Sequence, residues 1–302
     1  ALEHDILAFN VESEAELYRI QEIAKSMKKI AKISIRVNPN VDAKTHPYIS
    51  TGLKDNKFGV DEEKAISLYA LAKNMDSLLI KGIDCHIGSQ ITDISPFIDA
   101  ITKLVEMIEK LVLMGIEINH IDIGGGIGID YDDEKIIKFE EYADAISPIL
   151  NKYKLKVIFE PGRAIVGKAG VLLTKVEYIK KNEIKNFAII DAAMNDLLRP
   201  SLYNANHKII NISNSSGKQD TYDIVGPVCE TGDFLGKERS LSVNPHDILA
   251  ILDVGAYGMS MSSNYNSRLR PVELLIDGDK TSEIRKREVF NDLIKDESIP
   301  SN

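Results

Sequence analysis

Three stretches of this chain carry residue types that can act chemically on a bound ligand. A polar block at residues 160–163 opens with Glu160 and directly follows an apolar run. A histidine, His86, ends another apolar run, and glycines fill four of the five positions 124–128. Glycine amides can close on a phosphate, although a lone glycine cluster is often only a tight turn. A lone histidine is likewise often structural. Because these groups all come where a predicted strand ends, we interpret them as parts of one site.

The elements that position these residues alternate between short apolar runs and longer amphipathic ones. Strands are expected at residues 6–9, 33–37, 80–86, 118–123 and 156–159. Helices are expected at residues 14–27, 62–73, 98–114 and 139–153, with Ser13 and Asp61 as caps of the first two. This alternation predicts parallel β/α units, and the active site of such a barrel lies at the carboxyl ends of its strands. A closed barrel needs eight strands, so we predict an incomplete (β/α)8 TIM-like barrel with about five strands.

The sequence pattern changes after Arg163. Short β-rich runs follow at residues 171–178, 187–191, 208–212 and 248–252, separated by turn residues such as those at 211–220. We therefore expect a barrel domain over residues 1–167 and a C-terminal antiparallel β domain over residues 168–302.

Composition limits the partners. The net charge of −9, from 37 basic and 46 acidic residues, argues against binding to nucleic acid or to an anionic membrane surface. No apolar run approaches the roughly 20 residues that span a bilayer. Two cysteines are too few for a disulfide framework, which favours a reducing cytoplasm. No metal site is predicted.

The candidate residues each have a plainer interpretation. Arg163 and Arg199 offer planar donor forks that suit a carboxylate, but each is on its own more typical of a surface ion pair. Glu160 can equally pair with Arg163. Cys229 can donate a proton as a thiol, although cysteine is more often a small buried hydrophobe. Tyr257, flanked by glycines, can also simply cap the core.

Taken in order, these motifs resemble the pyridoxal phosphate decarboxylases with an alanine racemase-like barrel (group IV), and most closely the diaminopimelate decarboxylase family. The resemblance covers essentially the whole chain. The blocks that carry it, besides those above, are residues 36–39, 45–52, 56–59, 86–89, 191–196, 198–203, 225–233, 253–258 and 264–268.

The resemblance implies a role for each site residue. Pyridoxal 5'-phosphate would be held by His86 against its ring, by Glu160 at its pyridine nitrogen, and by a wider cofactor set: Ser89, Gly125, Gly126, Gly162, Arg163 and Tyr257. The substrate would be bound by Arg163, Arg199, Tyr203, Glu230 and Tyr257. Cys229 would protonate the carbon that loses carbon dioxide. Cys229 and Glu230 would reach across from a second subunit, which implies a homodimer with shared sites.

The implied reaction converts meso-2,6-diaminopimelate to L-lysine and carbon dioxide, the last step of lysine biosynthesis. The second carboxylate of this amino-acid substrate matches the two arginines, whereas a substrate with a distal cation would need an acidic group. The alternatives are another decarboxylase of this fold, acting on carboxynorspermidine, ornithine or arginine, and a catalytically dead scaffold.

The start of the chain bears on activity. The family's cofactor lysine lies in a Tyr-Ala-x-Lys-Ala-Asn-like strand, which this sequence does not contain, and Lys57 belongs to a different block. The sequence begins at Ala1, and its first residues do not have the pattern of a signal peptide. We therefore expect that three N-terminal barrel strands are missing, either because the sequence is a fragment of a longer protein or because the protein is naturally truncated, and that the chain as written forms no Schiff base with the cofactor.

Overall fold

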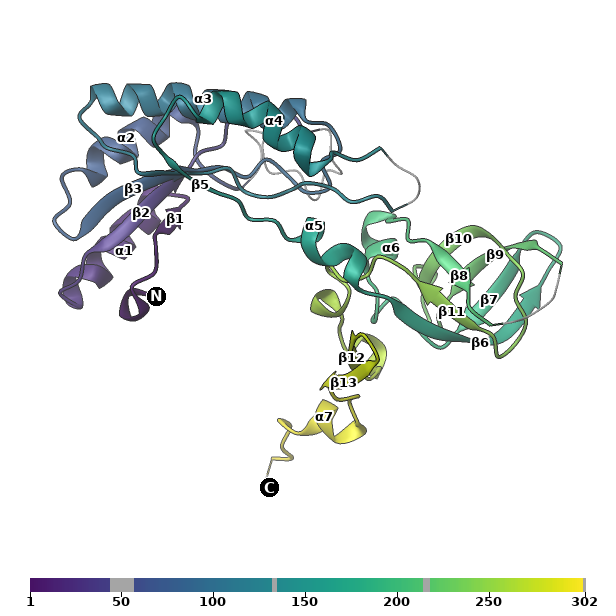
Figure 1. Cartoon of the computed structure of the whole chain (residues 1–302). Helices are drawn as coiled ribbons and strands as arrows, with labels where there is room; N and C mark the ends of the chain where they lie inside the picture. Colours follow the sequence, from purple (N-terminus) through teal and green to yellow (C-terminus); the bar gives the residue numbers. More distant parts are fainter. Residues whose placement is uncertain (44–56, 132–134, 214–217, 301–302) are drawn as a thin grey trace. The chain divides into compact units, whose positions relative to one another are not determined.

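The computed structural model describes residues 1–43, 57–131, 135–213 and 218–300 (Figure 1). The family block at residues 45–52 and the first residue of the block at 56–59 lie outside the described residues. The chain forms two compact units. The first comprises Ala1–Asp130 and Glu134–Ile165, and the second comprises Tyr131–Asp133 and Val166–Asn302.

The first unit is built on a five-stranded sheet in which every neighbouring pair is parallel. Its strands, in both chain and sheet order, are β1 (Phe9–Val11), β2 (Ala31–Arg36), β3 (Leu78–Asp84), β4 (His120–Asp122) and β5 (Lys156–Ile158). Helices α2 (Glu62–Ala72), α3 (Ser95–Leu113) and α4 (Phe139–Leu150) cover one face of this sheet (Figure 1), and α1 (Glu14–Ser26) contacts β2 and β3. The five parallel strands and their helices confirm the predicted incomplete barrel.

Local sequence explains these helices. Ser13 accepts a hydrogen bond from the Glu16 amide at 3.1 Å, and Asp61 accepts one from the Lys64 amide at 2.8 Å, so both predicted caps form. In α3 the buried residues recur every three or four positions, which places one apolar stripe against the sheet. The first strand was predicted too early, because Ile6 and Leu7 are exposed and the strand begins at Phe9.

The second unit contains a six-stranded sheet of order β10-β9-β7-β6-β11-β8. Its strands are β6 (Leu172–Lys181), β7 (Asn186–Ile190), β8 (Ile209–Asn211), β9 (Asp220–Val225), β10 (Phe234–Leu241) and β11 (Ile248–Ile251). All pairs are antiparallel except β7 with β9. A parallel pair needs a long crossover, and here the connection contains α6 (Arg199–Tyr203) and β8.

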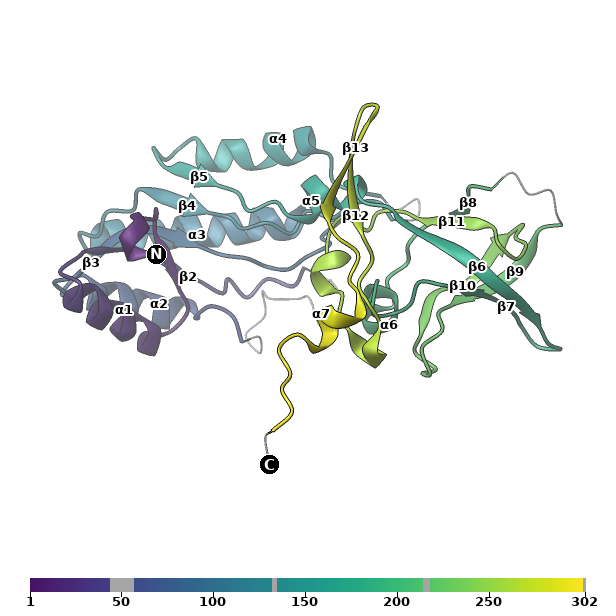
Figure 2. The ribbon, with the colours of Figure 1, turned by 90° about the horizontal axis from the view of Figure 1, so that it is seen from below.

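A separate hairpin, β12 (Glu273–Asp277) and β13 (Lys280–Arg285), follows, and the short helix α7 (Phe290–Ile294) comes after it. Figure 2 shows the hairpin edge-on as a two-stranded ribbon. Leu274, Leu275 and Ile276 on it are all at least half exposed. Across the part of the chain that the structure describes, no helix is both long and apolar enough to cross a membrane.

Candidate active site

Three neighbouring strand ends bring the first predicted residues together. His86 follows β3, the glycine run follows β4, and Glu160 follows β5. The backbone amide of Glu160 donates to the carbonyl of Gly124 at 2.8 Å, and the amide of Gly125 donates to Nδ1 of His86 at 3.2 Å. Because carboxyl ends of parallel strands share one edge of the sheet, residues far apart in sequence form one constellation here.

The glycine run is packed backbone against backbone. A Cβ on Gly125 would lie 2.1 Å from the carbonyl oxygen of Glu160, and one on Gly126 would lie 2.3 Å from the carbonyl oxygen of Gly88. Gly126 also has φ +105°, a conformation that other residues rarely adopt. Only glycine therefore fits at these positions, and we refer to this turn as the glycine cradle.

The imidazole of His86 is neutral at physiological pH. Burial, and secondarily the charge of Arg36, lower its pKa to about 4. Since Nδ1 accepts from the Gly125 amide, the single ring proton is assigned to Nε2. The ring is thus fixed as an uncharged, flat surface beside the glycine cradle.

Ser89 and Arg163 are joined by a hydrogen bond. Nη2 of Arg163 donates to Oγ of Ser89 at 3.1 Å, and Arg163 is only 5% exposed at the start of α5 (Arg163–Val166). Gly162, just before it, is exposed, as is Glu160. Among the described residues Glu160 makes no ion pair, so the plainer interpretation of a Glu160–Arg163 salt bridge is not seen, and Arg163 is not a surface residue.

Two buried carboxyl groups lie near Glu160 and were missed in the sequence. Asp84 and Asp122 end β3 and β4 and are register partners. Burial raises the pKa of Asp122 to about 6, with Glu160 adding to the effect, and burial with Asp122 raises the pKa of Asp84 well above its usual range. Each lies near the carboxyl end of a predicted strand, and this position could have indicated that both belong to the site.

In the second unit Arg199 is also buried, at 5% exposure, rather than in a surface ion pair. Its Nη1 donates to the hydroxyl of Tyr131 at 3.0 Å and lies 2.9 Å from Nε2 of His207. Tyr203 ends the same short helix, α6. Neither Tyr131 nor His207 was singled out in the sequence, because only the folded chain brings them to Arg199.

Cys229 is exposed on the loop after β9, which excludes the interpretation as a buried hydrophobe. Asp233 organises this loop, since its two carboxylate oxygens accept from the amides of Met194 and Val228, both at 2.7 Å. Glu230 is exposed too, and its carboxylate accepts a 2.6 Å hydrogen bond from the hydroxyl of Tyr265.

Tyr257 lies on the turn after β11 and is 43% exposed. Its φ of +62° is in the left-handed region, which is costly for a tyrosine and is often found at functional sites. Its exposure does not agree with a core cap.

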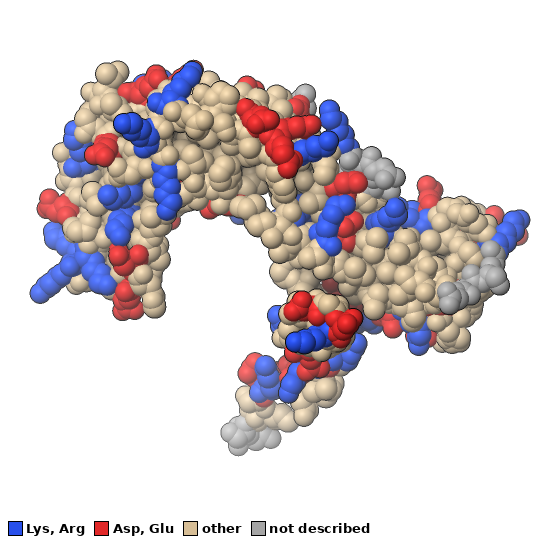
Figure 3. Space-filling model, in the orientation of Figure 1, with Lys and Arg blue, Asp and Glu red and all other residues tan. Residues whose placement is uncertain are grey.

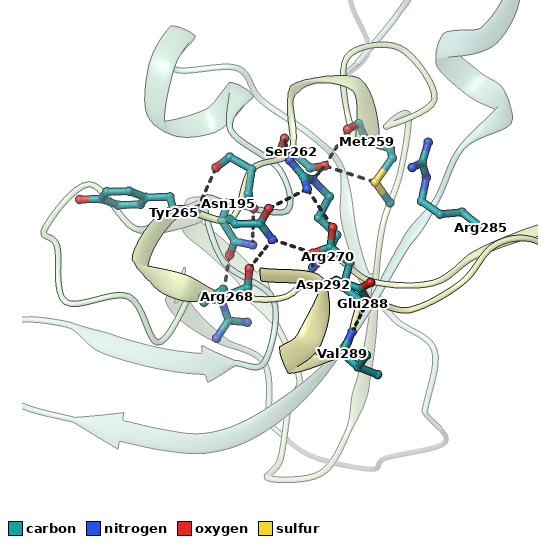
Figure 4. Close-up of polar contacts among 12 residues, drawn as sticks. Asn195, Met259, Ser262, Tyr265, Arg268, Arg270, Arg285, Glu288, Val289 and Asp292 are labelled. Atoms are coloured by element: carbon teal, nitrogen blue, oxygen red, sulfur yellow. Dashed lines mark hydrogen bonds and ion pairs between the residues drawn. The ribbon is translucent and has the colours of Figure 1, made fainter. Parts of the chain in front are cut away.

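A polar network links two of the family blocks (Figure 4). Nε of Arg268 donates to Oδ1 of Asn195 at 2.9 Å. Arg270 donates from Nη1 to Asn264 at 2.7 Å and to Glu288 at 2.9 Å. These bonds fix the segment that carries Tyr265. Tyr265 is the hydrogen-bond partner of Glu230, so the network also supports Glu230.

The predicted site residues thus form two sets. The first unit carries the cofactor candidates His86, Ser89, Gly125, Gly126, Glu160, Gly162 and Arg163. The second unit carries Arg199, Tyr203, Cys229, Glu230 and Tyr257. Within it the hydroxyl of Ser201 donates to the carbonyl of Gly232 at 2.6 Å, which ties α6 to the Cys229 loop. On the described residues of the face in Figure 3, basic and acidic side chains are interspersed, with no continuous basic surface.

Comparisons with known proteins identify the family of this chain. Residues 1–167 match the pyridoxal binding domain of the pyridoxal-dependent decarboxylases. The chain is 53% identical over 300 residues to a diaminopimelate decarboxylase of Vibrio cholerae, covering 99% of this chain and 72% of that protein. It is 52% identical over 295 residues to the Haemophilus influenzae diaminopimelate decarboxylase, covering 97% of this chain and 71% of that one. The crystal structure of the Helicobacter pylori diaminopimelate decarboxylase complexed with L-lysine superposes with a TM-score of 0.94 at 49% identity, over 98% of this chain and 74% of that one.

Proposed function

Because this chain belongs to the diaminopimelate decarboxylase family of pyridoxal-dependent decarboxylases, we propose that it converts meso-2,6-diaminopimelate to L-lysine and carbon dioxide. The observation that carries the proposal is the constellation at the three strand ends. There the glycine cradle bonds to the imidazole of His86 through the Gly125 amide, and to the backbone amide of Glu160, whose carboxylate is exposed, through the Gly124 carbonyl.

These residues fit pyridoxal phosphate. We assign the phosphate to the glycine cradle at Gly125 and Gly126, where the absence of side chains lets the backbone segments pack closely, together with the hydrogen-bonded pair Ser89 and Arg163. His86 offers its ring face, and Glu160 its carboxylate, which would hold a proton on the pyridine nitrogen. When bound, pyridoxal phosphate supplies an electron-withdrawing ring that accommodates the electron pair left by departing carbon dioxide. We assign Gly162 and Tyr257 to the same cofactor set.

Arg199 supplies the substrate preference. A guanidinium fork pairs with a carboxylate through two parallel hydrogen bonds, and diaminopimelate carries a second carboxylate at its distal end. Ornithine or arginine would bring a distal cation to the same place, where like charges repel at a cost of several kcal/mol. Tyr203, on the same helix, and Glu230, held by Tyr265, complete the proposed substrate contacts.

Cys229 donates a proton to the substrate carbon that has lost carbon dioxide. A thiol on an exposed loop can approach the substrate carbon that has lost its carboxylate, and Asp233 fixes the loop through two backbone amides. We propose that Cys229 and Glu230 serve the site of a partner subunit, so that the active form is a homodimer. Two free cysteines are consistent with a cytoplasmic location.

Product analysis tests this function. The holoenzyme, prepared at the natural length of the protein, should release one carbon dioxide for each lysine formed from meso-diaminopimelate. Cys229→Ala should keep its bound pyridoxal phosphate and lose rate by about 100-fold or more, the usual contribution of a general acid. Pyridoxal phosphate binding without any lysine formation would favour the scaffold alternative and overturn the proposal.

A further inference from the structure

In the second unit the buried guanidinium of Arg199 makes hydrogen bonds with Tyr131 and His207. We propose that Tyr131 and His207 are positioning residues that aim Arg199 at the distal carboxylate of the substrate, and so set the selectivity for a dicarboxylate. The inference rests on the proposed function, since it assumes that Arg199 receives that carboxylate. It adds Tyr131 and His207 to the proposed site, and their role is inferred from their hydrogen bonds to Arg199.

The hydrogen-bond geometry fixes the guanidinium. An Nη nitrogen of arginine carries two hydrogens, and those of Nη1 are both directed here: one to the hydroxyl of Tyr131 at 3.0 Å, the other to Nε2 of His207 at 2.9 Å. Because the guanidinium is planar and rigid, two bonds at one nitrogen set the direction of the whole fork. A carboxylate recognised through two parallel bonds depends on that direction.

The same contact sets the tautomer of His207. Arginine only donates, so Nε2 of His207 must accept and cannot carry a proton. The ring proton is therefore on Nδ1, which donates to the carbonyl oxygen of Leu252 at 2.9 Å. His207 is fully buried, and both its ring nitrogens are thereby used. It holds Arg199 against the end of β11 as a neutral bridge.

Tyr131 adds a second restraint. Its ring lies under the guanidinium, with Cζ of Arg199 4.9 Å from the ring centroid, and it meets the His207 ring edge-on at 5.1 Å. Tyr131 and His207 therefore restrain the guanidinium from two sides and orient it.

Matched variants separate the two hydrogen bonds of His207. A glutamine carries its amide oxygen near the place of Nε2, so His207→Gln keeps an acceptor for Arg199. An asparagine carries its amide near the place of Nδ1, so His207→Asn keeps the bond to Leu252 and loses the one to Arg199. Tyr131→Phe removes the other acceptor and keeps the ring.

The probes are L-lysine and 1,5-diaminopentane, which differ only by the carboxylate and are titrated into the holoenzyme by calorimetry. We expect His207→Asn and Tyr131→Phe to weaken lysine binding by about 10-fold and to leave diaminopentane binding unchanged. His207→Gln should bind lysine within about 3-fold of the wild type. Pyridoxal phosphate content and melting temperature identify any variant that is misfolded, in which case the remaining two decide.

Arg199→Lys separates this inference from the function beneath it. If Arg199→Lys loses lysine selectively while Tyr131→Phe and His207→Asn bind it as the wild type does, the positioning role is wrong and the role of Arg199 stands. If Arg199→Lys also binds lysine normally, Arg199 is not the carboxylate ligand and both ideas fail. Equal loss of lysine and diaminopentane in the His207 and Tyr131 variants would mean a merely structural role and would likewise overturn the inference.

Discussion

Replacing Gly125 with alanine tests whether the cradle and Glu160 form one unit. The new Cβ would stand 2.1 Å from the carbonyl oxygen of Glu160, a backbone atom that cannot rotate away. Cβ contacts in proteins essentially never fall below 3.0 Å, so the two segments must separate by at least 3.0 − 2.1 = 0.9 Å. The substitution therefore pushes the cradle away from the end of β5, so both segments are displaced by one change.

The expected size follows from overpacking. Forcing a methyl group into a closely packed site typically costs about 1–3 kcal/mol of stability. The displaced atom belongs to Glu160 itself, so the carboxylate proposed for the pyridine nitrogen moves as well. We expect Gly125→Ala to lower the free energy of unfolding by that amount and to weaken pyridoxal phosphate binding by about 10-fold or more.

The matched control is Gly128→Ala in the same turn. Its Cβ would meet the carbonyl oxygen of Ile91 at 3.1 Å, which a displacement of a few tenths of an ångström relieves. Urea unfolding and cofactor titration, run on both variants, give the comparison. If Gly125→Ala is as stable as Gly128→Ala and binds pyridoxal phosphate equally well, the cradle does not have the packing described above.

Three further predictions concern protons and subunits. Burial raises the pKa of Asp122 to about 6, so its contribution to stability is present below its ordinary pKa near 4 and is lost as pH rises through 6. Asp122→Asn should therefore remove about 1–2 kcal/mol of the fall in stability between pH 4 and pH 7, after allowance for solvent screening, and an unchanged pH profile in urea unfolding would contradict this. His86 should titrate near pH 4 and carry its proton on Nε2, which ¹⁵N NMR of the imidazole reports; a titration near 6.5 would refute the buried, neutral ring. Mixing Cys229→Ala with Glu160→Ala subunits should restore about a quarter of wild-type activity if the site is shared, because half of the dimers are mixed and each has one intact site. Absence of recovery despite proven subunit exchange would place both residues in one subunit's site.

The parts of the fold that obey local rules were predictable. The capped helices and the buried strand cores of the first unit follow from apolar periodicity and from Ser13 and Asp61 as caps. The start of β1 was not predictable in this way, since Ile6 and Leu7 are apolar yet exposed. Apolar character alone does not show at which residue a strand begins to pair with its neighbour.

The second unit shows where local reasoning stops. The parallel pairing of β7 with β9 depends on the path of the chain between them, to which no single residue points. Likewise, Tyr131 and His207 meet Arg199 across 68 and 8 positions of sequence. The family blocks identified Arg199 itself, but its burial and its neutral partners arise only from tertiary packing.

Substrate preference is the most direct test of the account as a whole. Steady-state kcat/KM should be measured for meso-diaminopimelate and for ornithine on the same preparation of holoenzyme. Because a distal cation would meet the fixed guanidinium of Arg199, we predict a preference for diaminopimelate of at least about 100-fold. Equal turnover of the two, or faster turnover of ornithine, would contradict the proposed role of Arg199 and with it the assigned reaction.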